Sequence, residues 1–173
     1  MLADFNTATP ELTRSLFHTI TVIYRQFPYF IHIFFHIRKT AMSDKQARAL
    51  IMLIKRDLNL PEKQNAAFAI VRVILDRKIM ISEVYDLMDE LSVLLLQSFN
   101  DSVRNQCSRV LLSFLLNYPM SNNRVEKLLA FLLKNLDYEE PSGRLALLHL
   151  LQNMLGSFPI EVYSYIIILI TSI

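Results

Sequence analysis

A helical segment recurs in this chain at a spacing of 40 residues. The run DSVRNQCSRVLLSFLLNYP, residues 101–119, is followed by PSGRLALLHLLQNMLGSFP, residues 141–159, and both end on an aromatic residue and a proline. A looser copy, EKQNAAFAIVRVILDR, lies 40 residues earlier, at 62–77. Repetition at a fixed period is the strongest constraint that a sequence of this length can carry, because each copy must fold in the same way.

The apolar residues of the three copies superimpose at helical spacing, which predicts the same buried helix face in each. Those shared positions are Ala67, Ile70, Val71, Ile74 and Leu75 in the first copy, Cys107, Val110, Leu111, Phe114 and Leu115 in the second, and Leu147, Leu150, Leu151 and Leu155 in the third. We call the helices of these copies the second-type helices.

A second set of apolar faces alternates with the first, at shifts of 37, 41 and 37 residues. These faces, which define first-type helices, comprise residues 47-50-51-54-58, 84-87-88-91-95, 125-128-129-132-136 and 162-165-166-169-173. Because the connections are short, consecutive helices are expected to fold back antiparallel. The predicted fold is therefore all-α: a HEAT- or armadillo-like α-solenoid of about four antiparallel helix pairs plus an unpaired C-terminal helix.

Helix starts are marked by capping residues and prolines. Ser43 and Gln46 match a capping box, in which each side chain bonds a free backbone N–H at the helix start. Other starts are predicted at Pro61, Ser82, Asp101, Ser121 or Asn122, Pro141 and Pro159.

The predicted repeats occupy 44–80, 82–119 and 121–158, with an incomplete repeat at 159–173. Residues 1–43 should form N-terminal helices, one starting at Pro10 and one from Pro28 to about Thr40, whose pairing the pattern does not define. The pattern stops in mid-repeat, so we expect adjoining repeats of a longer chain as a partner, and self-association through residues 162–173 when the chain is alone.

No residue pattern indicates catalysis or a cofactor. His32 and His36 lie four apart on one helical face, but the glutamate of a metalloprotease motif and a third ligand are missing, so a buried or semi-buried pair is favoured over a metal site. The same interpretation applies to His149. Cys107, the only cysteine, occupies an inward packing position. We therefore expect no enzyme active site, no metal and no cofactor.

The charges are scattered, with 18 Lys and Arg against 16 Asp and Glu, a net charge of +2 that does not by itself imply a nucleic-acid partner. Arg104 and Arg144, 40 apart, are expected to pair with acids or carbonyls of the preceding turn; phosphate contact is the alternative. The candidate contacts with RNA or protein are Arg72, Arg104, Arg109 and Arg144, on the assumption that second-type helices line the binding face.

The run 83–159, EVYDLMDELSVLLLQSFNDSVRNQCSRVLLSFLLNYPMSNNRVEKLLAFLLKNLDYEEPSGRLALLHLLQNMLGSFP, carries a family resemblance. Its stretches VYDLMDELS, SVRNQCSRVLLSFLLNYP, LDYEEPSGR and SFP resemble a segment of the U3 small nucleolar RNA-associated protein 20 family, also called down-regulated-in-metastasis protein. Residues 44–82 resemble the same family more loosely, and the resemblance does not extend to residues 1–43.

The resemblance implies a non-enzymatic helical-repeat scaffold of the nucleolus, within the nucleus. Members of that family belong to the small-subunit processome, so pre-ribosomal proteins and pre-ribosomal RNA become the expected partners, in rRNA processing and small-subunit assembly. Two alternatives remain. A generic HEAT-repeat adaptor would bind only proteins, and architecture cannot separate it from the scaffold. A membrane-associated helical protein is disfavoured by the capped, charge-punctuated helices.

Overall fold

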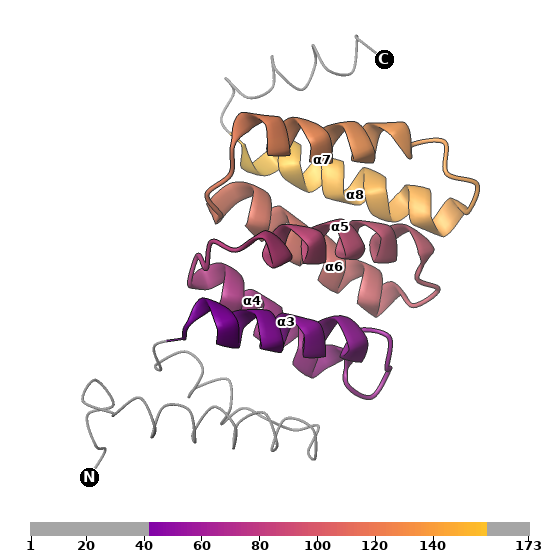
Figure 1. Ribbon diagram of the computed structural model, residues 1–173. Helices are drawn as coiled ribbons and strands as arrows, with labels where there is room; N and C mark the ends of the chain where they lie inside the picture. The colour runs from indigo at the N-terminus through magenta and orange to yellow at the C-terminus, as the bar shows by residue number, and fades with distance from the viewer. Residues whose placement is uncertain (1–41, 159–173) are drawn as a thin grey trace. The chain divides into compact units, whose positions relative to one another are not determined.

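The computed structural model describes residues 42–158, and all regular secondary structure in that range is α-helical (Figure 1). The chain divides into two compact units, Met1–Val84 and Tyr85–Ile173. The helix bounds are α3 (Asp44–Asp57), α4 (Gln64–Asp76), α5 (Ser82–Gln97), α6 (Asp101–Asn117), α7 (Asn122–Lys134) and α8 (Pro141–Ser157). The all-α prediction is confirmed, and the helix-to-helix packing is compatible with an α-solenoid.

In the first unit, α3 and α4 pack against each other. Helix α3 starts with the predicted capping box: the backbone N of Ser43 lies 2.9 Å from Gln46 Oε1, and the Ser43 hydroxyl accepts from the Gln46 N–H. The predicted start of α4 at Pro61 is wrong. Residues 61–63 form a turn, in which the N–H groups of Lys63 and Gln64 both donate to the Leu60 carbonyl, so the helix begins at Gln64.

The two apolar faces predicted for the first unit are confirmed. Every residue of both faces is at most 5% exposed: Ala47, Leu50, Ile51, Ile54 and Leu58 on α3, and Ala67, Ile70, Val71, Ile74 and Leu75 on α4. Helix α3 is amphipathic and buries one narrow apolar stripe. Helix α4 also buries Phe68 and Val73 and is therefore apolar on most of its surface.

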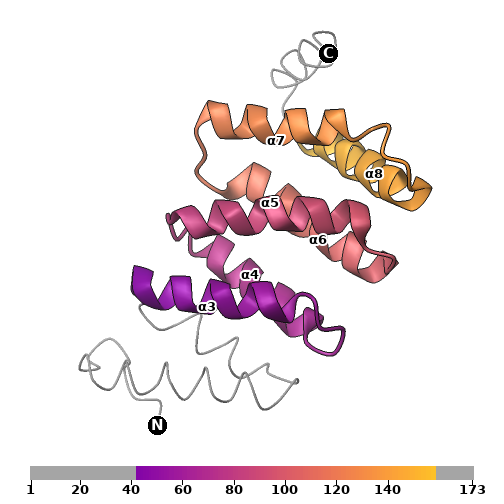
Figure 2. The same cartoon turned by 45° about the vertical axis from the view of Figure 1, so that its right-hand side comes forward.

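In the second unit, α6 and α8 lie side by side (Figures 1 and 2). Helix α8 has Pro141 at its first turn, as predicted. Helix α6 is capped by Asn100 and not by Asp101, because the Asn100 side chain accepts a 2.9 Å hydrogen bond from the Ser102 N–H. Ser82 is likewise inside its helix, and its hydroxyl donates to the Glu83 carboxylate.

An aromatic cluster joins α5, α6 and α7. The Tyr85 ring of α5 meets Phe114 and Tyr118 edge-on, with centroids 5.9 and 5.7 Å away, and its hydroxyl donates to the Pro119 carbonyl. The guanidinium carbon of Arg124, at the start of α7, lies 3.6 Å from the centroid of the Tyr85 ring. These contacts hold the connection after α6 against α5.

Most predicted core positions of α5 to α8 are buried, including all five on α5 and all five on α6. The predictions for Leu136 and Leu155 are wrong, because these residues are 37% and 43% exposed, and Val125 and Leu151 are only half-buried. Leu136 follows the end of α7 and so leaves the helical register of that face. Leu155 is exposed although the corresponding residue of α6, Leu115, is buried.

Several predictions fall outside the described residues: the two N-terminal helices, the pair His32 and His36, and the apolar face of 162–173. Within the described residues, no helix combines the length and the apolarity needed to cross a membrane.

Candidate functional site

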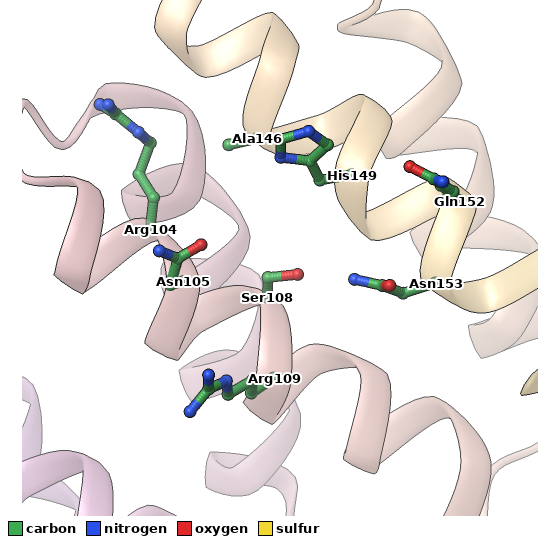
Figure 3. A pocket seen from close by; sticks show the side chains of 8 residues that line it. All are labelled: Arg104, Asn105, Ser108, Arg109, Ala146, His149, Gln152 and Asn153. Carbon is green, nitrogen blue, oxygen red and sulfur yellow. The ribbon is translucent and has the colours of Figure 1, made fainter. Parts of the chain in front are cut away.

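A polar groove of about 280 Å³ lies between α6 and α8 in the second unit (Figure 3). Residue numbers rise in the same direction along both helices in this view, so α6 and α8 run roughly parallel, as equivalent helices of successive repeats should. The lining residues are Arg104, Asn105, Ser108 and Arg109 from α6 and Ala146, His149, Gln152 and Asn153 from α8.

Arg104 lines the groove, but its side chain stabilises the fold and is hardly exposed to solvent. The residue is only 7% exposed, and its guanidinium donates to the Ser98 carbonyl and pairs with the Asp101 carboxylate. In Figure 3 its side chain extends away from α8. The guanidinium therefore ties the first turn of α6 to the loop that precedes it.

Arg144 makes the equivalent contact 40 residues later. Its Nη1 donates to the Tyr138 carbonyl at 2.6 Å and to the Glu139 carbonyl at 2.9 Å. In both helices the arginine reaches the carbonyl six positions before it. The expectation that Arg104 and Arg144 bind acids or carbonyls of the preceding turn is confirmed. Neither guanidinium is presented as an open phosphate ligand.

Arg109 differs from these two arginines. It is exposed at the α6 rim of the groove, and no hydrogen bond or ion pair of its guanidinium is present among residues 42–158. Arg72 is half-buried on α4, in the other unit, and does have an interaction partner. Of the four candidate arginines, the structure thus places only Arg104 and Arg109 in the groove.

The α8 side of the groove was not predicted from the sequence. His149 was expected to be buried or semi-buried, but it is exposed, as are Gln152 and Asn153. The spacing of these three residues within an otherwise apolar helix was the available signal, because positions i, i+3 and i+4 share one helix face. The equivalent side of α6 carries Asn105 and Arg109, which are also exposed.

The groove carries positive charge without any compensating carboxylate in its lining. Helix α8 contains no Asp or Glu, and the one acidic residue of α6, Asp101, is paired with Arg104. Arg109 is therefore the arginine of the lining whose charge no acid of α6 or α8 offsets. A ligand with negative charge and hydrogen-bond acceptors suits this lining.

Metal or nucleophile chemistry finds no support in the part of the chain that the structure describes. No cluster of three His, Cys, Asp or Glu residues suited to a metal ion is present among residues 42–158. Cys107 is fully buried, and burial raises the pKa of its thiol to about 12. The thiol is therefore protonated at neutral pH, and its predicted role as a small core residue is confirmed.

Comparison with known proteins adds a family assignment. No family model matches the chain. The U3 small nucleolar RNA-associated protein 20 of Schizosaccharomyces pombe is 35% identical over 109 residues, which cover 63% of this chain and 4% of that protein. The protein of the same name from Saccharomyces cerevisiae is 27% identical over 122 residues, which cover 70% of this chain and 5% of that protein.

The two similarities support the U3 small nucleolar RNA-associated protein 20 family, since both relatives carry that name. This chain spans about one twentieth of the length of these two relatives. The resemblance in residues 83–159 therefore identified the family correctly. That run contains α6, α8 and the whole groove between them, so the site lies in the part of the sequence on which the resemblance was based.

Proposed function

We propose that this chain is a helical-repeat scaffold that acts, without enzymatic activity, in pre-ribosomal RNA processing and small ribosomal subunit assembly. The observation that carries this proposal is the similarity to two proteins that are both named for association with U3 small nucleolar RNA. On this proposal the chain works in the nucleolus, as part of the small-subunit processome, and its partners are pre-ribosomal RNA and pre-ribosomal proteins.

The architecture is suited to such a role. Stacked helices bury their apolar faces against one another and leave an extended outer surface for binding partners. The exposed polar face of α6 and α8 is one such surface, and its charge favours an anionic partner. HEAT-type repeats would supply this stacking throughout the chain, with each helix pair contacting its neighbours.

The test is a pull-down of the tagged, native full-length protein from nuclear extract, followed by sequencing of the RNA recovered with it. We expect enrichment of U3 RNA and of small-subunit pre-ribosomal RNA over a tagged protein of similar size. Recovery of protein partners without either RNA would contradict the proposal. Nuclease treatment before capture separates partners that bind the protein directly from those that are held through RNA.

A protein-only adaptor is the second candidate, and one observation favours it. Phe99, in the loop between α5 and α6, is 90% exposed, and Met52 on α3 is 72% exposed. Exposed large apolar side chains of this kind often anchor protein–protein interfaces. On this alternative the pull-down recovers the same proteins before and after nuclease treatment, and no RNA is enriched.

A further inference from the structure

The groove between α6 and α8 has the chemistry of a site for a nucleic-acid backbone. We propose that it binds the ribose-phosphate backbone of RNA, with Arg109 on a phosphate and with His149, Asn153 and Asn105 on neighbouring phosphate or ribose oxygens. This inference rests on the proposed function, and it names the surface and the chemical group through which that function makes contact.

Most of the lining side chains are exposed and make no hydrogen bonds with the described part of the chain, which supports binding of a separate ligand. Asn105, Arg109, His149, Gln152 and Asn153 are all exposed, and none of their side chains bonds another group within residues 42–158. Ser108, on the floor, is 9% exposed and opens its hydroxyl toward Asn153 in Figure 3. The hydrogen-bond donors of these side chains do not bond one another. They are therefore available for acceptor atoms of a ligand.

The charge of the lining favours a polyanion over a protein as the ligand of the groove. A protein surface would present a mixture of donors, acceptors and charges, and a groove that matches it would be expected to contain acids as well as bases. This lining contains Arg109 and no carboxylate, and the charge of its second arginine, Arg104, is already paired with Asp101. Half or more of the hydrogen bonds in protein–nucleic-acid interfaces go to phosphate and sugar, and arginine, asparagine, glutamine and serine are usual donors to them.

The size and the lining of the groove indicate backbone contact without base stacking. Its volume of about 280 Å³ holds a few polar groups of a larger ligand and not a whole small molecule of the usual size. None of the eight lining residues is Phe, Tyr or Trp, and the imidazole of His149 is the single aromatic ring of the lining, although unstacked bases are normally held on aromatic rings. We therefore expect binding that depends on salt and tolerates any base sequence.

The amide side chains give the groove a means to distinguish RNA from DNA. Asn105 lines the α6 side, and Gln152 and Asn153 line the α8 side. Each amide offers both a donor and an acceptor, which suits the 2′-hydroxyl of ribose. Arg109 at the rim supplies the charge that fixes a phosphate. RNA should bind more tightly than DNA of the same sequence and length.

The test uses the full 173-residue chain and a fluorescently labelled RNA of mixed sequence, with binding followed by fluorescence anisotropy at several salt concentrations. The variants are Arg109→Ala, the double change Arg109→Ala with His149→Ala, and Arg109→Lys, which keeps the charge. Lys127→Ala is the matched control, because Lys127 is an exposed cation on α7 outside the groove. Circular dichroism verifies that each variant is folded.

We expect the double variant to bind RNA about tenfold more weakly, and Arg109→Ala to reduce the slope of log affinity against log salt by about 1. Arg109→Lys should retain the slope, because it still neutralises a phosphate. Lys127→Ala should change affinity by less than about twofold. Equal losses in Arg109→Ala and Lys127→Ala, or no loss in the double variant, would overturn the assignment of the groove.

The same variants in the full-length native protein separate this inference from the proposed function. If wild type recovers pre-ribosomal RNA and the double variant recovers it with undiminished ultraviolet crosslinking at α6 and α8, the groove is not the contact and the proposed function stands. If wild type recovers no pre-ribosomal RNA, the proposed function fails. If the double variant loses a protein partner while RNA crosslinking is unchanged, the groove binds protein and the inference is wrong.

Discussion

At the scale of single residues, Gly143 marks a very close approach between two helices. A Cβ atom at this position would lie 2.5 Å from the Leu96 carbonyl oxygen and 2.9 Å from Cδ1 of Tyr138. The start of α8 therefore approaches the end of α5 so closely that only glycine fits. The backbone oxygen cannot move without shifting α5, and this makes the site sensitive to a single methyl group.

Gly143→Ala should lower the free energy of unfolding by about 1–3 kcal/mol, because the added methyl group forces α5 and α8 apart. Gly156→Ala is the matched control. It lies in the same helix with no atom within 4 Å of the added Cβ, so it should be neutral or stabilise by up to about 1 kcal/mol. Urea denaturation measures both. Equal effects at the two glycines would show that the contact with Leu96 is unimportant.

The buried thiol of Cys107 and the buried phenol of Tyr118 predict how the stability of the protein changes at high pH. Burial raises the pKa of Cys107 from 9.0 to about 12, and burial, with a smaller contribution from Tyr85, raises that of Tyr118 from 10.0 to about 12. A raised folded-state pKa means that the stabilisation is complete below the unfolded pKa and is lost as pH rises through the folded one.

The free energy of unfolding should therefore fall between about pH 9 and pH 12, and the fall should be smaller in a Cys107→Ala, Tyr118→Phe double variant. Denaturation midpoints across this range, compared between the variant and wild type, isolate these two groups, because the rest of the chain is the same in both proteins. Identical pH profiles for the two proteins would contradict the assignment.

At the scale of helices, the starts are stabilised by different contacts. Ser43 makes a full capping box at α3, whereas Ser121 at α7 has the backbone geometry of a cap without a side-chain hydrogen bond. Ser43→Ala should therefore cost about 1 kcal/mol, while Ser121→Ala should cost much less. Thermal or urea unfolding of the two single variants measures the difference. A larger loss at Ser121 would be inconsistent with these cap geometries.

The contacts of Arg104 and Arg144 with the carbonyl six residues earlier are a second way of holding a helix start. Arg104→Met should destabilise the protein by about 1–3 kcal/mol, since it leaves the Ser98 carbonyl without that donor. Arg109→Met, on the same helix but exposed, should change stability by less than about 0.5 kcal/mol. Comparable losses for the two arginines would show that the contact with Ser98 adds little.

At the scale of the whole molecule, the helices of each unit pack mainly on their neighbours. In a stacked-helix protein, stability is approximately a sum of local terms, so damage in one place should spread little. Phe68, fully buried on α4 in the first unit, is the point to test. Phe68→Ala removes a large core side chain and should cost about 3–5 kcal/mol within that unit.

Hydrogen exchange followed by mass spectrometry measures how far the effect of Phe68→Ala extends. Amide exchange should accelerate most in α3 and α4, and much less in α7 and α8. Uniform acceleration along residues 42–158 would indicate a single cooperative unit and would contradict the local-stability expectation. Leu150→Ala, fully buried on α8, is the reciprocal variant and should produce the opposite pattern.

The periodicity of the sequence alone determined the helix content and most of the core. Positions such as Ile51, Leu91 and Leu111 could be predicted because helical spacing requires their side chains to share one face, and burial of that face stabilises the fold. The pairing of Arg104 and Arg144 with the preceding turn was also predictable, since it is a local contact repeated at the period of 40.

Only the tertiary structure decided which outward side chains lie together. The groove joins Arg109 to His149 and Asn153, residues about 40 apart whose proximity depends on α6 and α8 packing side by side. The glycine-only contact at Gly143 likewise depends on how close the neighbouring helix lies. Helical spacing determines which face of a helix a residue occupies, but neighbouring helices determine what that face meets.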